Sequence, residues 1–498
     1  MANREYVLAV DQSTSGTKAL LVDKMGSVLA RGSAEHTQYY PRPGWVEHDP
    51  VEIYENVKQA IRKVMTAAGI RSEELAALTI TNQRETAVLW DRATGLPVGR
   101  AIVWQCQRTA VACAELRALG YEESVREKTG LMLDPYFSAT KWSWLLDHIE
   151  GARARADRGE LLAGTIDSWL LWKLTGGKVH ATDYTNASRT QLFNISTLQW
   201  DEELCQWFRV PIGLLPEAKD SDAVFGEASE LGLFDTPVPI SGVIGDSQAA
   251  LFGHLCLDPG MAKATYGTGT SVLMNVGDRP IQGVKGLVNT VAWGRKGKAT
   301  YALEAVIRTS GDSLKWVRDN LGLFQTFEEL DALLQEANEH EGVYLVPAFV
   351  GLGAPYWAPD ARASIIGLNR GSGRAQIVRA AIDSIAYQVR DAVQLLQEES
   401  GVPLIALRAD GGASDNRVLM QFQADMLGQT VLKSNVSELS ALGSVYMGGL
   451  GVGFWQSEEE IAANLDSESY IRYSPFMEKD TRATLYQGWK AAVATVLR

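Results

Sequence analysis

Cysteine is scarce in this chain of 498 residues. The four that occur are too few to cross-link a chain of this length, and no pair has the CxxC spacing of a zinc or redox site. We therefore expect reduced thiols in a cytosolic protein. The residues concerned are Cys106, Cys113, Cys205 and Cys256.

The sequence also lacks the signals of secretion, membrane insertion and nucleic-acid binding. Its N-terminus, MANREYVLAVD, does not have the basic, apolar and small-residue order of a signal peptide, and no apolar run approaches the ~20 residues that span a bilayer. Clusters of Lys and Arg are missing too, and the net charge is −13. These absences predict a cytoplasmic protein with no membrane insertion and no nucleic-acid partner, in which any anionic ligand is held by local groups.

What is present is an ordinary globular composition, with 46% hydrophobic and 21% charged residues. The chain is far longer than the ~150 residues of a typical domain, so two large domains are expected. Strand-like runs at Tyr6 to Val10 and Leu75 to Thr81 flank a segment, residues 51 to 68, whose apolar positions have helical spacing. This alternation is typical of an α/β layer fold.

The same pattern begins again in mid-chain. A strand-like run at Ile240 to Ile244, a helical segment and the turn Asp258-Pro259-Gly260 precede a new strand from Met261. We place the domain boundary here, with an N-terminal domain of residues 1–253 and a C-terminal domain of residues 254–498. Thr268 follows Thr14 by 254 positions (268 − 14), which indicates two diverged halves rather than a short repeat.

Two small-residue turns follow strand-like runs, DQSTSGTK at residues 11–18 and YGTGT at residues 266–270. Free backbone N–H groups in such turns can hold one polyphosphate between the two halves. A third turn, DGGA at residues 410–413, lies between a strand and a helix, where a nucleotide can contact backbone. Taken singly, each turn is better explained as a tight strand end, since no GxxxxGK[ST] or strict GxGxxG motif is present.

Asp11 and Asp246 each end an apolar strand. Phosphoryl transfer needs a metal, a cradle for the phosphates and a base aligned with the attacking hydroxyl. One carboxylate can hold hydrated Mg²⁺ and the other can take the hydroxyl proton. A lone aspartate after a strand is more often a turn or capping residue, but two beside candidate anion turns favour a function.

Arg84 and Glu85 form an adjacent charged pair after a β-like run. If buried, the pair requires polar partners, and a polyhydroxylated substrate fits because Arg84 donates and Glu85 accepts hydrogen bonds. A surface ion pair explains these two residues equally well when they are taken alone.

Long strings of the sequence carry a further signal. They are TNQRET at 81–86, VWQ at 103–105, PYFSATK at 135–141, GTIDSWLLWKLTGGKVHATDYTNASRT at 164–190, LVPAFVGLGAPYW at 345–357 and ADGGASDN at 409–416. With these strings the chain resembles the FGGY carbohydrate kinase family and, within it, the glycerol kinases, in register from about Tyr6 to about Trp455. The resemblance implies two actin-like (ribonuclease H-like) α/β domains with an interdomain cleft for ATP and a sugar or polyol.

The resemblance implies ATP-dependent, Mg²⁺-assisted phosphorylation of a primary hydroxyl of a small polyol, glycerol to glycerol 3-phosphate, by a homodimer or homotetramer. It makes Asp246 the catalytic base and Asp11, with Asp246, the metal ligand. The implied polyol contacts are Arg84, Glu85, Tyr136, Asp246 and Ser247. The implied ATP contacts are Thr14, Ser15, Lys18, Thr268, Gly311, Gly411 and Asn416.

The chain departs from the family pattern around this site. Lys18 stands where the family has arginine, which keeps the charge and loses the bidentate fork. Ser247 replaces a glutamine, Ser271 replaces a phenylalanine, and WQDRR becomes WQCQR with Cys106 and Gln107. A larger, more polar pocket would admit a longer polyol or ketose of the erythritol, erythrulose or xylulose type. If neighbouring groups or water refill the space, glycerol remains the substrate, and the rest of the chain favours glycerol.

Two other classes of protein remain alternatives at this point. An actin-like ATPase scaffold would share the nucleotide turns, but it has no need of the polyol pocket that Arg84, Glu85 and Tyr136 indicate. A sugar sensor without turnover has no need of both Asp11 and Asp246. Residues 226–236, which correspond roughly to a loop phosphorylated on histidine in some family members, contain no histidine, so we expect that control to be absent.

Overall fold

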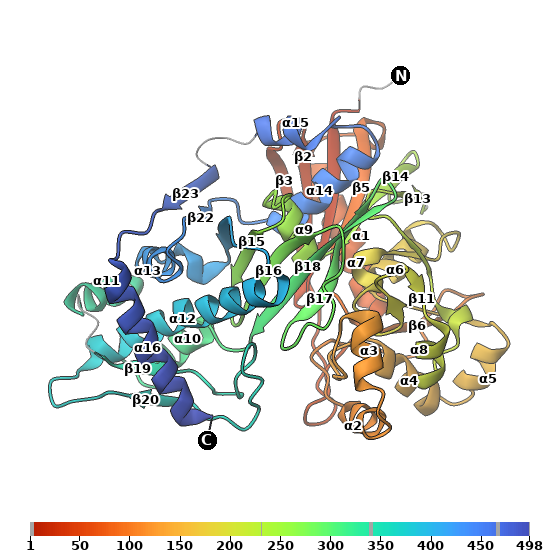
Figure 1. The fold of residues 1–498 in the computed structure, drawn as a ribbon. Helices are drawn as coiled ribbons and strands as arrows, with labels where there is room; N and C mark the ends of the chain where they lie inside the picture. The colour runs from red at the N-terminus through yellow and green to blue at the C-terminus, as the bar shows by residue number, and fades with distance from the viewer. Residues whose placement is uncertain (1–3, 231, 338–341, 465–468, 498) are drawn as a thin grey trace.

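The computed structural model describes residues 4–230, 232–337, 342–464 and 469–497. Two large sheets form its framework, and helices pack against both (Figure 1). The first sheet has the order β13-β14-β5-β1-β2-β3 and the second the order β17-β18-β16-β15-β21-β22-β23. The first comprises β1 (Tyr6–Gln12), β2 (Gly16–Asp23), β3 (Val28–Glu35), β5 (Leu75–Asn82), β13 (Val224–Ala228) and β14 (Val238–Gly245). The second comprises β15 (Met261–Tyr266), β16 (Thr270–Gly277), β17 (Val288–Arg295), β18 (Lys298–Ile307), β21 (Ala406–Asp410), β22 (Val431–Ser434) and β23 (Tyr470–Tyr473).

The two sheets repeat one pairing pattern. β1 pairs antiparallel with β2 and parallel with β5, and β5 pairs parallel with β14. In the second sheet β15 pairs antiparallel with β16 and parallel with β21, and β21 pairs parallel with β22. The prediction of two diverged halves is therefore confirmed at the level of sheet topology.

Shorter strands and a set of helices complete the described part of the chain. The paired short strands are β4 (Glu47–His48) with β7 (Ala101–Ile102), β6 (Val88–Asp91) with β8 (Leu161–Gly164), β9 (Ala181–Asp183) with β12 (Glu217–Lys219), β10 (Phe193–Asn194) with β11 (Gln199–Trp200), and β19 (Tyr344–Val346) with β20 (Ser364–Ile366). The helices are α1 (Pro50–Ala68), α2 (Ala110–Ala118), α3 (Glu122–Thr129), α4 (Ala139–His148), α5 (Ala152–Asp157), α6 (Ile166–Leu174), α7 (Tyr184–Ala187), α8 (Glu202–Trp207), α9 (Asp246–Gly253), α10 (Gly311–Asp319), α11 (Phe327–Glu336), α12 (Arg374–Ser400), α13 (Arg417–Leu427), α14 (Leu439–Gly451), α15 (Glu458–Asn464) and α16 (Lys479–Val496). Short 3₁₀ turns occur at η1 (Ser72–Glu74), η2 (Ile212–Leu214) and η3 (Gly412–Asp415).

Helix α1 shows how local sequence sets these boundaries. Asp49 caps its N-terminus by accepting hydrogen bonds from backbone N–H groups, and Pro50 occupies the first turn, where its missing N–H does no harm. Gly69 ends the helix with φ of 66°, a left-handed conformation that glycine adopts without strain. The apolar positions that predicted this helix are all buried, namely Ile53, Val57, Ala60, Ile61 and Val64.

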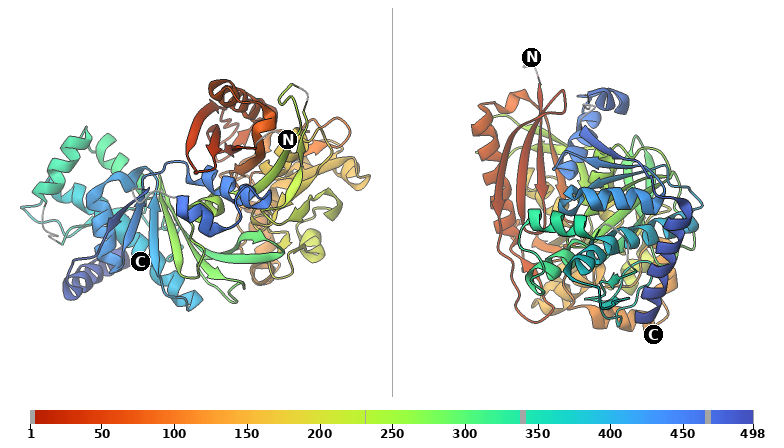
Figure 2. Two further views of the ribbon diagram at one scale, coloured as in Figure 1. Left: turned by 90° about the horizontal axis from the view of Figure 1, so that it is seen from above. Right: turned by 90° about the vertical axis from the view of Figure 1, so that its left-hand side faces the viewer.

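Each half has its own apolar core, and a third core lies where the halves meet. That third core joins side chains from both sheets, among them Val7, Leu273 and Val445. Helix α14, although late in the sequence, packs on β1, β5 and β14 of the first sheet and on α9 (Figure 2). Residues after the predicted boundary therefore also cover the first sheet.

The described residues bear on two further expectations. All four cysteines are free and buried. Within the described ranges, we find no helix with the length and apolar character needed to cross a membrane.

Gly443 allows α14 to lie directly on α9, because a Cβ at this position would overlap the carbonyl oxygen of Ala249. We predict that Gly443→Ala forces the two helices apart and destabilises the fold by about 1–3 kcal/mol, the usual effect of overpacking a core. Urea unfolding followed by tryptophan fluorescence measures this. Gly213→Ala is the matched control, since a Cβ there meets no atom within 4 Å. Equal midpoints for the two variants would contradict the prediction.

Candidate active site

Asp11 and Asp246 come together because their strands run parallel on either side of β5. Thr81 of β5 is the register partner of Asp11 in β1 and of Ile244 in β14. The carboxyl ends of these strands therefore meet at one edge of the sheet, where Asp246 begins α9. The pKa of Asp11 is raised to about 7, mainly by burial and then by the negative charge of Asp246, while Lys18 opposes the shift.

Arg84 connects this edge to the second sheet. Its Nε lies 3.1 Å from Asp246 Oδ1, and its Nη2 lies 3.1 Å from Glu304 Oε1 on β18. Its Nη1 donates to Gln248 Oε1 at 3.2 Å. The Arg84 side chain is 6% exposed whereas that of Asp246 is 38% exposed, so a buried cation lies behind an accessible carboxylate.

A second buried arginine completes the cluster. Arg189 Nε donates to Glu85 Oε1 at 2.6 Å, and its Nη1 lies 2.8 Å from Glu304 Oε2. Burial alone would raise the pKa of Glu304, but the guanidinium groups of Arg84 and Arg189 outweigh burial and hold that pKa far below its ordinary value. For Glu85 the balance is reversed, and burial keeps the pKa raised despite Arg189 and Arg84.

The backbone of Glu85 is also unusual. Its φ is 62°, in the left-handed region that side chains other than Gly, Asn and Asp seldom adopt. Such conformations occur disproportionately at binding sites, where the surroundings hold a side chain in a required direction. Together with burial of the charge, this excludes the reading of Arg84 and Glu85 as a surface ion pair.

Tyr136 lies against the same cluster. Its ring is 5.3 Å from that of Trp104, and the Arg189 guanidinium lies 5.9 Å from the Tyr136 ring centre. Trp104 in turn donates from Nε1 to Thr14 Oγ1 at 3.0 Å, which links the polyol candidates to the first turn. Burial raises the pKa of Tyr136, with Glu85 as the next contribution, so its hydroxyl stays protonated.

Two serines line the same region. Ser247 is in the first turn of α9, and its backbone N–H donates to Asp246 Oδ1 at 2.6 Å. Ser271 is the second residue of β16 on the second sheet, and its Oγ donates to Glu304 Oε1 at 2.9 Å. Both serines are half-buried.

The predicted nucleotide contacts fall into two groups. Thr268 and Gly311 line a cavity of about 370 Å³ with apolar walls from Leu314, Phe324 and Leu330. Gly411 lies next to a lining residue and has φ of 88°, and a Cβ there would overlap the backbone of Tyr266. The remaining cavity lining is Tyr266, Gly267, Lys315, Arg318, Phe327, Gly412 and Ala413.

Thr14, Ser15 and Lys18 do not line that cavity. They lie at the turn from β1 into β2, where Lys18 is the register partner of Asp11. Asn416 does not line it either; its side chain caps α13 by accepting from Leu419 N at 2.9 Å. The structure therefore places the first turn beside the carboxylates and the second and third turns beside the cavity.

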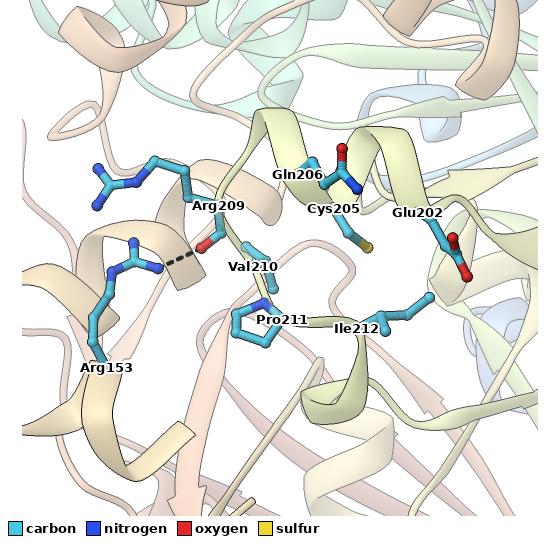
Figure 3. A pocket seen from close by; sticks show the side chains of 8 residues that line it. All are labelled: Arg153, Glu202, Cys205, Gln206, Arg209, Val210, Pro211 and Ile212. Carbon is cyan, nitrogen blue, oxygen red and sulfur yellow. Dashed lines mark hydrogen bonds between the residues drawn. The ribbon is translucent and has the colours of Figure 1, made fainter. Parts of the chain in front are cut away.

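A separate cavity of about 360 Å³ lies among the helices of the N-terminal half (Figure 3). Arg153 and Arg209 border it, but Arg153 already donates to the carbonyl oxygen of Arg209, and both arginines pair with Asp147. It contains none of the predicted site residues.

Sequence reasoning missed three side chains of the cluster, Arg189, Gln248 and Glu304. Glu304 had a usable signal, since it is a single charge inside the apolar run YALEAVI at 301–307. Arg189 lies within a string that resembles the family, but nothing local shows that it reaches Glu85 and Glu304.

Comparison with known proteins identifies the family and the fold. The chain matches the N-terminal domain model of the FGGY family of carbohydrate kinases over residues 6–253 and the C-terminal domain model over residues 262–452. A glycerol kinase of Caldanaerobacter subterraneus is 50% identical over 494 residues, covering 99% of each chain. One of Carboxydothermus hydrogenoformans is 51% identical over 490 residues, covering 98% of each.

Solved structures give the same fold. The Plasmodium falciparum glycerol kinase with ADP has a TM-score of 0.94 and 34% identity, covering 100% of this chain and 99% of that one. The xylulose kinase of Lactobacillus acidophilus, at 20% identity, has a TM-score of 0.88, with coverage of 98% and 97%. The two-domain actin-like fold predicted from the sequence is confirmed, and the chain belongs to the FGGY family of carbohydrate kinases.

Proposed function

We propose that this chain transfers the γ-phosphoryl group of ATP to a primary hydroxyl of a small polyol, and that the polyol is glycerol. The observation that carries the proposal is the Arg84 guanidinium, buried between Glu304 and the accessible carboxylate of Asp246. A buried, charged and hydroxyl-lined site of this kind suits a neutral acceptor that both donates and accepts hydrogen bonds. The names of the relatives at about half identity support glycerol.

Each acceptor hydroxyl has a partner of suitable chemistry. Asp246 accepts the proton of the reacting hydroxyl, while the remaining N–H hydrogens of Arg84 donate to the acceptor and Glu85 accepts from it. Tyr136 covers the carbon skeleton with its ring and keeps a neutral hydroxyl. Because Arg84 contacts Asp246 directly, the same guanidinium that binds the acceptor also orients the base.

The nucleotide fits the second and third turns. The apolar walls of the cavity suit a purine, and Lys315 and Arg318 at the cavity supply positive charge. Thr268, Gly311, Gly411 and Asn416, with Thr14, Ser15 and Lys18 across the opening, are the proposed contacts to ATP.

Asp11 and Asp246 fit a divalent cation. Mg²⁺ is usually held by one or two carboxylates together with substrate phosphates and water. The negative charge of Asp246 contributes, after burial, to the raised pKa of Asp11. When bound, Mg²⁺ neutralises charge that develops on the transferred phosphoryl group. Lys18 lies on the neighbouring strand, and its single positive charge cannot balance both carboxylates.

Several wider predictions stand beside this proposal. We propose the division into residues 1–253 and 254–498, which the ends of the two family models at 253 and 262 support. Four buried, free thiols support a reducing, cytoplasmic location. A homodimer or homotetramer remains a prediction from the family resemblance.

Asp246→Asn tests the proposed base. With glycerol and Mg-ATP, we predict a loss of about 10²–10⁴-fold in kcat, the usual contribution of a general base, in a coupled ADP-release assay. ATP affinity measured by calorimetry without Mg²⁺ should change by less than about threefold, since Asp246 does not line the nucleotide cavity. Asp235→Asn, at an exposed position, is the control. Near-normal turnover of the variant would remove Asp246 as base, and a wild-type protein inert toward glycerol would remove the acceptor.

Lys141→Met tests how Tyr136 is held. The buried ammonium of Lys141 donates to the carbonyl oxygens of Tyr136 at 2.7 Å and Phe137 at 2.8 Å, and also to that of Pro135. Removing it releases this segment, so we predict a rise of about tenfold or more in the KM for glycerol, with a smaller change in the KM for ATP. Lys178→Met, on the exposed surface, is the control. Equal changes in both KM values would indicate a general loss of structure instead.

Asp11→Asn tests the metal ligand through binding. The pKa of Asp11 is raised from 3.8 to about 7, so below pH 7 a proton competes with the cation and binding weakens as pH falls. The measurement is the Mn²⁺ affinity of the wild type and of the variant, by electron paramagnetic resonance with ADP present. Below pH 7, the affinity of the wild type should fall more steeply than that of the variant, by up to about tenfold per pH unit. The variant is the matched control, because any pH dependence that comes from the nucleotide is the same in both proteins. Identical pH dependence in both proteins would contradict the assignment.

A further inference from the structure

Ser271 and Glu304 form a polar wall on the second sheet, opposite the polyol candidates of the first. In the antiparallel pair of β16 and β18, Ser271 is the partner of Val306, and Leu273 is the partner of Glu304. Side chains of register partners share a face, and residues two apart along a strand share it too, so Ser271 and Glu304 lie on one face. On that face, the Glu304 carboxylate contacts Arg84.

The buried negative charge of Glu304 is balanced without Ser271. Its Oε1 already pairs with Arg84 Nη2 at 3.1 Å, and its Oε2 pairs with Arg189 Nη1 at 2.8 Å. The Ser271 hydroxyl adds a third partner at 2.9 Å, on the oxygen that also accepts from Arg84. The consequence of this bond falls on Ser271, because it fixes the direction of the serine hydroxyl.

The fixed hydroxyl has capacity left for a ligand. A serine hydroxyl offers one hydrogen and two lone pairs, and Ser271 spends its hydrogen on Glu304. Its oxygen can therefore accept from a ligand hydroxyl, and the side chain is only half-buried. Ser247 adds a second half-buried hydroxyl beside Asp246, and no described residue accepts a hydrogen bond from it.

In the proposed function, Asp246, Arg84 and Glu85 bind the hydroxyls of a three-carbon acceptor. Arg84 contacts Asp246 through Nε and Glu304 Oε1 through Nη2, and Ser271 donates to the same Glu304 oxygen. Ser271 is therefore linked to the Glu304 side of the Arg84 guanidinium rather than to its Asp246 side.

We propose that Ser271, oriented by Glu304, is a specificity-determining residue that accepts a hydrogen bond from the far hydroxyl of a four-carbon polyol or ketose. The acceptor class then includes erythritol-type compounds alongside glycerol. This inference rests on the proposed kinase function and assigns a further subsite within the same site. A group that binds a hydroxyl discriminates strongly against acceptors that lack one, which makes Ser271 a position where substrate choice is decided.

The test compares kcat/KM for erythritol, erythrulose and glycerol in the wild type and in three variants. Ser271→Ala removes the accepting oxygen, and Ser271→Phe fills the subsite. Thr270→Val is the matched control, because Thr270 is on the same strand with its hydroxyl bonded to Ser310 on the other face. We expect the better four-carbon acceptor to be used by the wild type within about tenfold of glycerol. We expect its kcat/KM relative to glycerol to fall about tenfold in Ser271→Ala, further in Ser271→Phe, and to stay constant in Thr270→Val.

Failure of this inference is distinct from failure of the proposed function. Two results overturn the subsite and leave the kinase proposal standing. In the first, the wild type phosphorylates glycerol but its kcat/KM for the better four-carbon acceptor is more than about tenfold lower. In the second, Ser271→Ala leaves the ratio of the two kcat/KM values unchanged. A wild type that phosphorylates none of the three acceptors overturns both. The subsite is supported if the ratio falls because the KM for the four-carbon acceptor rises while the circular dichroism spectrum is unchanged. A purely structural role of Ser271 would change the KM values for both acceptors together.

Discussion

One buried guanidinium holds the site together. Arg84 is ion-paired with Asp246 from the N-terminal half and with Glu304 from the C-terminal half, so its position depends on both sheets being in place. An arginine cannot lose its proton to escape burial, and its charge must be balanced by fixed partners. These ion pairs therefore fix the orientation of the proposed base and tie the two halves together at the site, in addition to the apolar core that joins them.

The charges around Arg84 do not cancel. Arg84 and Arg189 contribute two positive charges, whereas Glu85, Glu304 and Asp246 contribute three negative ones. Asp11 adds a further acidic group at the same edge, and its pKa is raised mainly by burial and then by the negative charge of Asp246. An acidic excess beside an opening, next to turns suited to phosphate, is the arrangement that a cation and a nucleotide would complete.

The parts of this site that lie at strand ends can be predicted from the sequence. These parts include Asp11, Arg84 and Asp246, since each follows an apolar strand and parallel pairing brings such strand ends to one edge of the sheet. The glycine turns at 266–270 and 410–413 were visible for the same reason, although alone they were better explained as tight strand ends. Resemblance to the family, and not spacing, supplied the roles. Family membership also removes the actin-like scaffold as an alternative.

The rest could not be predicted, because it depends on contacts between distant segments. Glu304 lies 220 positions from Arg84, and no local pattern specifies that pairing. Trp104 donates to Thr14 across the site, and nothing local in the sequence indicates that contact. Ser271 was noticed as a departure from the family, yet its bond to Glu304 emerges only when β16 and β18 are placed side by side.

The most direct test of the account is a crystal structure of the chain with glycerol, Mg²⁺ and a non-hydrolysable ATP analogue. The account predicts a primary hydroxyl of glycerol within about 3.2 Å of the Asp246 carboxylate and in line with the γ-phosphorus, with Arg84 and Glu85 on the other hydroxyls. Glycerol bound elsewhere, or an Asp246 carboxylate turned away from the acceptor and the γ-phosphate, would contradict it.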